Sequence, residues 1–418
     1  YTKEVVFFVE QVTGHVIPDV RQFLAIGAEG ILAKLEENQA ACADDKKKTY
    51  YEAMKISVQA MLILAERYAA LAEEKAKVSE GKGKERFELM AATLRKVPAK
   101  GAENLYEAIQ SFILCWQTMC LEQTPNPFAF SVGNADRIFE PYRAKEDLDR
   151  DMTAALLKHL LVFYNVADRS WAISQNLIIG GRDADGNDLT NPTSFALFDA
   201  YYEMNLPQPI LSVKLHKNTP DKLYEELGRF LFTPGCLTPS LFNDDSLYEV
   251  LSKAGVDIDD IEDTSIAGCQ EPLIMGKDNG NTTNSWLNLP KILEMTLTGG
   301  ISTVTGEKLA DVEACTLENV QEEFYKNVER FVAEMAQAAN GASVALSTQR
   351  VPLLSCFMGG LENGIDMRDF NAQGTKYNGS GCLIHGLSVI ADSFVAVDCL
   401  LRERPEDAEN LIAACACD

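Results

Sequence analysis

The sequence predicts an α/β protein in which a sheet or a barrel packs against many helices. Two observations support this fold class. In the first part of the chain, apolar residues recur at the spacing of amphipathic helices, and from about Trp171 short β-like runs alternate with helical patterns. Alternation of strands and helices favours either an α/β barrel or an open sheet with added helices.

Amphipathic helices are predicted over much of the first part of the chain. Two long apolar stripes keep a spacing of three or four residues, and a shorter amphipathic segment lies between them. The stretch 79–84, rich in Lys, Glu and Gly, is interpreted as a solvated turn. The stripe residues are Tyr51, Met54, Val58, Met61, Ala65 and Tyr68, then Phe87, Met90, Ala91 and Leu94, then Leu105, Ile109, Phe112, Ile113, Trp116 and Cys120.

Strands and helices alternate in the second part of the chain. The runs 175–180 and 210–216 are predicted as short strands, and Thr219 is predicted to cap a helix with proline at its first position. Another helix is predicted over 246–254, with Asp245 as its cap. A long helix that ends near Gly341 is predicted from the apolar face Phe324, Val328, Phe331, Met335 and Ala339.

Composition excludes several classes of function. The net charge of −24 argues against binding to nucleic acid or to an anionic membrane surface, because both require clustered Lys and Arg. The most apolar stretch, 154–167, is too short to span a bilayer, and no secretory signal is visible. Eleven cysteines without a Cys-x-x-Cys pair, together with four histidines, indicate a reducing cytoplasm and no metal site.

The most informative motif is Ser-Ile-Ala-Gly-Cys-Gln-Glu-Pro at 265–272. In extended backbone, the side chains of residues i and i+2 leave the same face, so Cys269 and Glu271 are expected to point into one cavity. A thiol beside a potential general base is a reactive arrangement. A cysteine of the apolar core would have apolar neighbours on its face, whereas this one has a glutamate.

Two further segments leave alternatives open. His15 lies in Gly-His-Val-Ile-Pro, where a lone histidine is either structural or functional. Thr282 and Thr283 follow the Cys-x-Glu motif by about a dozen residues. That distance suits a chain that enters a cavity and returns, and it equally suits a surface turn.

Several segments, taken together, resemble the glycyl radical enzyme family, which includes pyruvate formate-lyase and the glycerol and diol dehydratases. They occur in the order of that family across essentially the whole chain, and the ordered set is far more specific than any one segment. The matching segments are 14–19, 133–142, 179–182, 239–244, 268–271, 374–378 and 391–393.

This resemblance implies a ten-stranded α/β barrel with extensive surrounding helices. Residues 1–170 would form a mainly helical part of the shell, and 171–418 would form the barrel part with Cys269 on an internal finger loop, in one structural domain. In the family, a stored glycyl radical passes to the cysteine that Cys269 matches, and the resulting thiyl abstracts hydrogen from the substrate. Glu271 matches the base of the eliminating members.

Departures from the family pattern bear on the substrate. Gln270 stands where pyruvate formate-lyase has a second cysteine, which disfavours acyl transfer from pyruvate. Phe128 and Ala129 align with a His-Ser pair of the glycerol-type dehydratases, so a substrate with an apolar part is expected. The resemblance places a group of residues at the substrate cavity: His15, Phe128, Ala129, Thr282, Thr283 and Trp286, with Thr283 at the position of an acidic ligand and Thr282 at a position that lines the site of a choline-cleaving relative.

No Arg-Val-x-Gly-Tyr-like radical loop occurs in these residues. We therefore expect the chain to be the central portion of a longer enzyme, inert by itself, although a naturally split enzyme is the alternative. The resemblance implies no bound cofactor, a glycyl radical outside this chain, a radical S-adenosylmethionine activase as partner, a small-molecule substrate and a homodimer.

The predicted function is that of a glycyl radical eliminase, either a dehydratase or a carbon–heteroatom lyase, acting on a small hydroxylated molecule. A decarboxylase or carbon–carbon lyase of the same family is the first alternative. A cysteine hydrolase would need a histidine base close to Cys269 in space. A catalytically inactive scaffold or subunit is the remaining alternative, suggested by the missing glycine loop.

Overall fold

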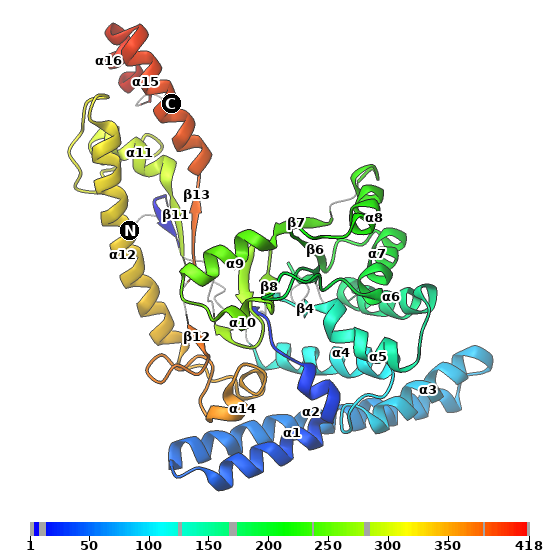
Figure 1. The fold of residues 1–418 in the computed structure, drawn as a ribbon. Helices are drawn as coiled ribbons and strands as arrows, with labels where there is room; N and C mark the ends of the chain where they lie inside the picture. Colours follow the sequence, from blue (N-terminus) through cyan, green and yellow to red (C-terminus); the bar gives the residue numbers. More distant parts are fainter. Residues whose placement is uncertain are drawn as a thin grey trace. The chain divides into compact units, whose positions relative to one another are not determined.

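The structure is a computed structural model, and its residues fall into two compact units, each built from separate stretches of the chain (Figure 1). The large unit comprises Thr13–Gly280 and Ser347–Gly379, and the small unit comprises Tyr1–Val12, Asn281–Leu346 and Ser380–Asp418. The expected division at 170/171 within one structural domain stays a prediction. The structure describes residues 4–7, 14–123, 128–166, 174–235, 238–279, 285–378 and 381–415.

The three helices expected in the first part of the chain are present in the large unit. The apolar stripes lie on α2, α3 and α4, although Tyr68 and Met90 are partly exposed on their helices. The expected turn at 79–84 is shorter than predicted, because α3 begins at Gly81. The first helices are α1 Arg21–Ala41, α2 Asp45–Lys77, α3 Gly81–Lys96, α4 Leu105–Glu122, α5 Ala135–Lys145, α6 Arg150–Val166 and α7 Pro192–Met204.

The remaining helices of the large unit correct two predicted caps. The helix after Thr219 begins at Asp221, and the Thr219 hydroxyl instead accepts a hydrogen bond from the His216 amide at 2.8 Å. The next helix is capped by Asn243, whose side chain accepts from the Ser246 amide, and not by Asp245. These helices are α8 Asp221–Leu231, α9 Asp244–Lys253, α10 Ile258–Ile261, α13 Pro352–Ser355 and α14 Gly360–Asn363.

A parallel four-stranded sheet in the order β4-β5-β6-β7 forms the centre of the large unit. The two strands predicted from the sequence are its middle members. Leu177 on β5 is level with Leu211 on β6, both are buried, and α5 packs against β5. The ten-stranded barrel remains a prediction. The strands of this unit are β2 Gly14–Val16, β3 Phe128–Phe130, β4 Gly133–Asn134, β5 Asn176–Gly180, β6 Ile210–Leu215, β7 Ser240–Asn243, β8 Thr264–Ala267, β9 Glu271–Ile274, β10 Asp278–Asn279 and β12 Tyr377–Asn378.

The small unit holds a three-stranded sheet in the order β1-β11-β13, covered by helices. Its long helix α12 continues past Gly341, the predicted end, to Leu346, because one glycine lowers helix stability by only about 1 kcal/mol. Among the described residues, no helix has the length and apolarity needed to cross a bilayer. The elements are β1 Val6–Phe7, β11 Ser285–Asn288, β13 Cys382–His385, α11 Leu289–Thr298, α12 Val320–Leu346, α15 Leu387–Glu403, a 3₁₀ turn Pro405–Asp407 and α16 Ala408–Cys415.

Trp116 is the centre of an aromatic cluster in the core of the large unit. Its ring lies edge-on to Phe130, Phe163 and Tyr164, with centroids 4.9 to 6.0 Å away. The indole Nε1–H donates to the Phe130 carbonyl at 3.0 Å, and the side chain is fully buried. This bond ties α4 to β3, the strand that carries Ala129.

We predict that Trp116→Phe lowers the free energy of unfolding by about 1–3 kcal/mol, because the buried Phe130 carbonyl loses its donor. Urea denaturation followed by circular dichroism measures this change. The control is Tyr224→Phe, which alters a half-exposed ring and is expected to change stability by less than about 0.5 kcal/mol. Equal effects of the two substitutions would contradict the assigned role.

Candidate active site

The Cys-x-Glu motif forms the tip of an antiparallel hairpin. Strands β8 and β9 pair with Ala267 opposite Glu271, and residues 268–270 make the turn. The expectation of continuous extended backbone is therefore wrong, because Gly268 adopts φ +69° and the chain reverses there. Cys269 lies exposed in the turn, whereas the Glu271 side chain at the start of β9 is only 7 % exposed.

Side chains from the central sheet hold the base of the hairpin. The ammonium group of Lys214 on β6 donates to the carbonyls of Glu262 and Thr264 at 3.1 and 2.9 Å. The Arg137 guanidinium donates to the same Glu262 carbonyl at 2.6 Å, and the Asn134 amide donates to the Asp263 carbonyl at 3.2 Å. The backbone that leads into β8 is thus held from several elements.

Charges buried beneath the hairpin balance one another. Lys214 is fully buried, and burial lowers its pKa to about 8 against the opposing attraction of Asp244 and other carboxylates. Asp263 receives two bonds from the guanidinium of Arg21, at 3.0 and 2.7 Å, and that guanidinium also pairs with Asp19. These contacts link α1 to the strand that precedes Cys269.

The tip of the hairpin is held through the peptide groups of Gly268. The amide of Asn176 on β5 donates to the Gly268 carbonyl at 2.9 Å and to the Ser212 hydroxyl at 3.0 Å. The Gly268 amide donates to the Ser131 hydroxyl at 3.4 Å. Asn176 and Ser131 are fully buried, and both were missed as site residues in the sequence. A polar residue that opens an otherwise apolar strand, as Asn176 does, is the signal that could have found it.

Three predicted site residues converge on Gly268. A Cβ placed on this glycine would lie 3.0 Å from Oε2 of Glu271, 3.1 Å from Nε2 of His15 and 3.2 Å from Cβ of Ala129. Glycine is therefore favoured by the tight space as well as by the positive φ. The backbone N–H of Gln270 also orients the Glu271 carboxylate, because it donates to Oε2 at 3.0 Å. A carboxylate, an imidazole and a methyl group surround the residue next to the cysteine.

His15 and Ala129 sit at equivalent places on paired strands. β2 and β3 run parallel, with Gly14 level with Phe128 and Val16 level with Phe130. Both intervening residues have positive φ, +47° for His15 and +55° for Ala129, which is uncommon for residues other than glycine. Such backbone strain costs about 1–3 kcal/mol and concentrates at functional sites. Burial lowers the pKa of His15 to about 4, so its imidazole is neutral at pH 7.

Cys269 is held as a thiol. Although the residue is exposed, its sulfur is partly shielded, and this burial together with the negative charge of Glu271 raises the pKa of the thiol. A nucleophilic cysteine requires the opposite, a pKa lowered by a neighbouring cation. The histidine that a cysteine hydrolase would need is present nearby, but in its neutral form it supplies no such cation. The surroundings suit the release of a hydrogen atom better than nucleophilic attack.

Not all predicted site residues belong to this constellation. Phe128 lies on β3 level with Gly14, but its side chain, like Thr282 and Thr283, lies outside the described part of the chain. Trp286 belongs to β11 of the small unit, where its ring stacks on His385 with centroids 4.5 Å apart. The roles of these four residues stay predictions. Within the described ranges, no group of three or more His, Cys, Asp or Glu side chains could hold a metal ion.

The chain belongs to the pyruvate formate lyase-like family, whose model matches residues 5–418. Membership in this family of glycyl radical enzymes confirms the resemblance found in the sequence.

The chain is similar to three dehydratases. It is 26 % identical to (2S)-3-sulfopropanediol dehydratase of Klebsiella oxytoca, over 96 % of this chain and 52 % of that protein. It is 27 % identical to trans-4-hydroxy-L-proline dehydratase of Clostridioides difficile, over 88 % of this chain and 49 % of that protein. The glycerol-bound B12-independent glycerol dehydratase of Clostridium butyricum superposes with a TM-score of 0.91 at 25 % identity, over 99 % of this chain and 55 % of that one. The chain spans about half the length of these relatives.

We predict that Glu271→Gln accelerates alkylation of Cys269 by iodoacetamide at pH 8, by about threefold or more. Removing the carboxylate charge lowers the pKa of the thiol and increases the thiolate fraction. Peptide mass spectrometry follows this cysteine separately from the other ten. Glu249→Gln removes an exposed charge elsewhere and serves as the control. Equal alkylation rates in the two variants would show that the carboxylate does not act on the thiol.

We further predict that Asn176→Ala frees the hairpin tip. The Gly268 carbonyl would lose its buried donor, at a cost of about 1–3 kcal/mol, and amide hydrogen exchange in peptides covering 264–274 would accelerate.

The matched control is Asn279→Ala, which removes one buried amide bond to the Met367 carbonyl at 2.9 Å elsewhere in the large unit. It is expected to lower stability similarly without a selective increase in exchange at the hairpin. If both variants accelerate exchange at 264–274 equally, Asn176 is only a general core residue.

Proposed function

We propose that this chain carries the thiyl cysteine and the base of a glycyl radical eliminase that acts on a small hydroxylated substrate. The observation that carries the proposal is the convergence of Glu271, neutral His15 and Ala129 on Gly268, beside a cysteine whose pKa is raised. Radical transfer requires a thiol hydrogen, and elimination requires a carboxylate within reach of the same substrate.

In the activated enzyme, the Cys269 thiol gives up its hydrogen atom to the glycyl radical. The Cys269 sulfur then takes hydrogen from the hydroxyl-bearing carbon of the substrate, so that an S–H bond forms as a C–H bond breaks. Glu271 accepts the hydroxyl proton, which leaves a ketyl-like radical. That radical expels the group on the adjacent carbon as an anion, which takes up the proton that Glu271 accepted. The product radical finally recovers a hydrogen atom from Cys269, and a carbonyl compound is released.

The hairpin supplies the positioning that these steps require. Glu271 is almost fully buried, and its carboxylate is fixed by the Gln270 amide, so it can meet a substrate without a large reorganisation. Reacting radicals must also be kept from water, and we propose that the remainder of the enzyme encloses the tip that is exposed in this chain.

The surroundings favour a substrate that is less polar on one side. The methyl group of Ala129 approaches the site where a hydrogen-bonding side chain is expected in glycerol-type dehydratases, so the site offers no polar partner there. Neutral His15 and the Glu271 carboxylate face the polar side. The names of the relatives, a sulfopropanediol dehydratase and a hydroxyproline dehydratase, support a hydroxylated substrate with a neighbouring leaving group.

The test uses the complete gene product, activated under anaerobic conditions by a radical S-adenosylmethionine activase and offered hydroxylated acids, diols and amino alcohols. We predict that Cys269→Ser abolishes turnover. Glu271→Gln is expected to slow elimination by about 10²–10⁴-fold because the proton acceptor is lost.

Both variants should retain the electron paramagnetic resonance signal of the stored radical, which separates a catalytic defect from a failure of activation. The exposed Glu249→Gln serves as the charge control and should retain full activity. An unchanged rate in Glu271→Gln would remove the base role. A wild-type enzyme that forms the radical but turns over no compound of the panel would favour the inactive-scaffold alternative.

A further inference from the structure

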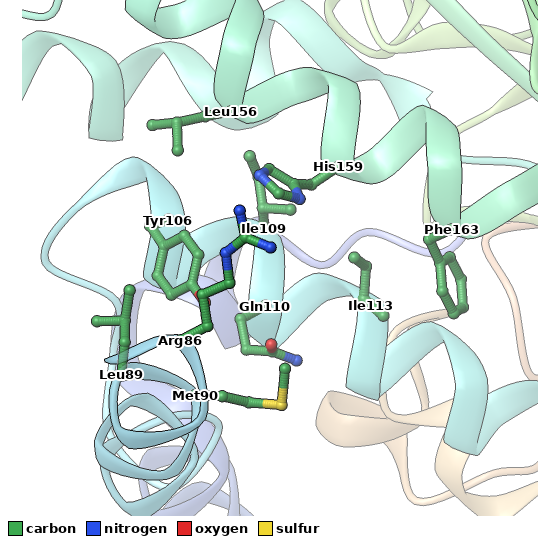
Figure 2. A pocket seen from close by; sticks show the side chains of 10 residues that line it. All are labelled: Arg86, Leu89, Met90, Tyr106, Ile109, Gln110, Ile113, Leu156, His159 and Phe163. Atoms are coloured by element: carbon green, nitrogen blue, oxygen red, sulfur yellow. The ribbon is translucent and has the colours of Figure 1, made fainter. Parts of the chain in front are cut away.

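Three helices of the large unit line a cavity that lies apart from the Cys269 hairpin. It lies among α3, α4 and α6 and has a volume of about 600 Å³, within the range of small-molecule sites (Figure 2). None of its lining residues belongs to β8, to β9 or to the turn between them. In the sequence, the segments that form α3 and α4 are predicted only as amphipathic helices.

Six apolar and four polar side chains line the cavity. The phenolic hydroxyl of Tyr106 stays protonated at neutral pH, since burial raises its pKa. The apolar side chains are Leu89, Met90, Ile109, Ile113, Leu156 and Phe163, and the polar ones are Arg86, Tyr106, Gln110 and His159.

Charge makes the cavity unusual for this protein. The chain carries 62 acidic residues, yet no carboxylate lines the cavity. Among the residues that the structure describes, Arg86 has no hydrogen bond or ion pair. On the same helix, Arg95 is occupied by Glu66 and Glu73, and on α4 the carboxylate of Glu107 is taken by Lys96. An arginine without a carboxylate partner, in so acidic a chain, retains its full capacity to bind an anion.

The side chains are arranged to present that charge inward. Figure 2 shows the guanidinium of Arg86 extending from α3 toward the imidazole of His159, between Tyr106 and Ile109. Met90 and Gln110 lie below it, and Phe163 and Ile113 border the far side. A ligand that pairs with Arg86 would therefore place the rest of its body over apolar side chains.

We propose that this cavity binds a small organic anion, a carboxylate with an aromatic or branched apolar body. A guanidinium binds a carboxylate with two parallel hydrogen bonds, and Tyr106, Gln110 and His159 offer additional donors. Leu89 is 53 % and Met90 is 38 % exposed, so an apolar ligand would remove hydrophobic surface from water. The lining contains no carboxylate for a divalent cation and too few polar groups for a sugar.

The test measures binding of phenylacetate to the complete gene product by isothermal titration calorimetry, with the uncharged phenylacetamide as comparison. Phenylacetate is expected to bind with saturation, and phenylacetamide about tenfold or more weakly, because a charge-assisted pair is lost. Arg86→Gln should weaken phenylacetate binding by a similar factor, and added salt should weaken it in the wild type.

Two control variants separate this cavity from other sites. Arg67 also makes no hydrogen bond or ion pair among the described residues, but it lies beside a different hollow, so Arg67→Gln should leave the dissociation constant unchanged. His15→Ala alters the candidate active site and should also leave it unchanged. The proposal is overturned if phenylacetamide binds as tightly as phenylacetate, or if Arg86→Gln leaves phenylacetate binding unchanged. It is also overturned if His15→Ala abolishes that binding, or if no saturable binding is seen because other protein covers the cavity.

Discussion

The hydrogen bonds to Gly268 are the constraint on which the candidate site depends. A three-residue turn by itself leaves its central residue free to reorient, and Cys269 is that residue. The Asn176 side chain donates to the Gly268 carbonyl, and the Ser131 hydroxyl accepts from the Gly268 amide. These bonds hold the turn at the residue immediately before Cys269. Glu271, His15 and Ala129 crowd the space where a side chain at position 268 would lie, and together with the positive φ this favours glycine. The cysteine is positioned through its neighbour.

This arrangement sets the protonation states of the site. The same burial that brings His15 against Gly268 lowers the pKa of the imidazole, and the same carboxylate that lies beside the hairpin tip raises the pKa of the thiol. The candidate site therefore holds a thiol, a neutral imidazole and a carboxylate. A hydrolase with the same residues would invert the first two states, because it needs a thiolate and an imidazolium. Electrostatics, more than residue identity, separates the two classes of chemistry here.

The sequence predicted the residues of the site better than their geometry. Cys269 and Glu271 were paired on the assumption of extended backbone, yet their proximity arises from a reversal at Gly268. The periodic helices α2 and α4 were predictable because an amphipathic stripe depends only on local spacing. Asn176 and Lys214 were not, because their partners are backbone carbonyls of residues far along the chain. The two predicted helix caps were wrong for a related reason: the Thr219 hydroxyl accepts from the His216 amide, and the Asp245 carboxylate accepts from the Lys217 amide.

Lys214 is a buried charge that lowers stability but helps to position the candidate site. Burial of an ammonium group costs several kcal/mol unless it is paired, and replacement by apolar residues is often neutral or stabilising. An apolar side chain at this position, however, would remove the bond to the Thr264 carbonyl and one of the two side-chain bonds to the Glu262 carbonyl, at the point where the chain enters β8. Asp244 and its neighbours offset part of the cost by favouring the charged form. The lysine is therefore best understood as fixing the direction of the hairpin, which in turn determines where the sulfur of Cys269 meets a substrate.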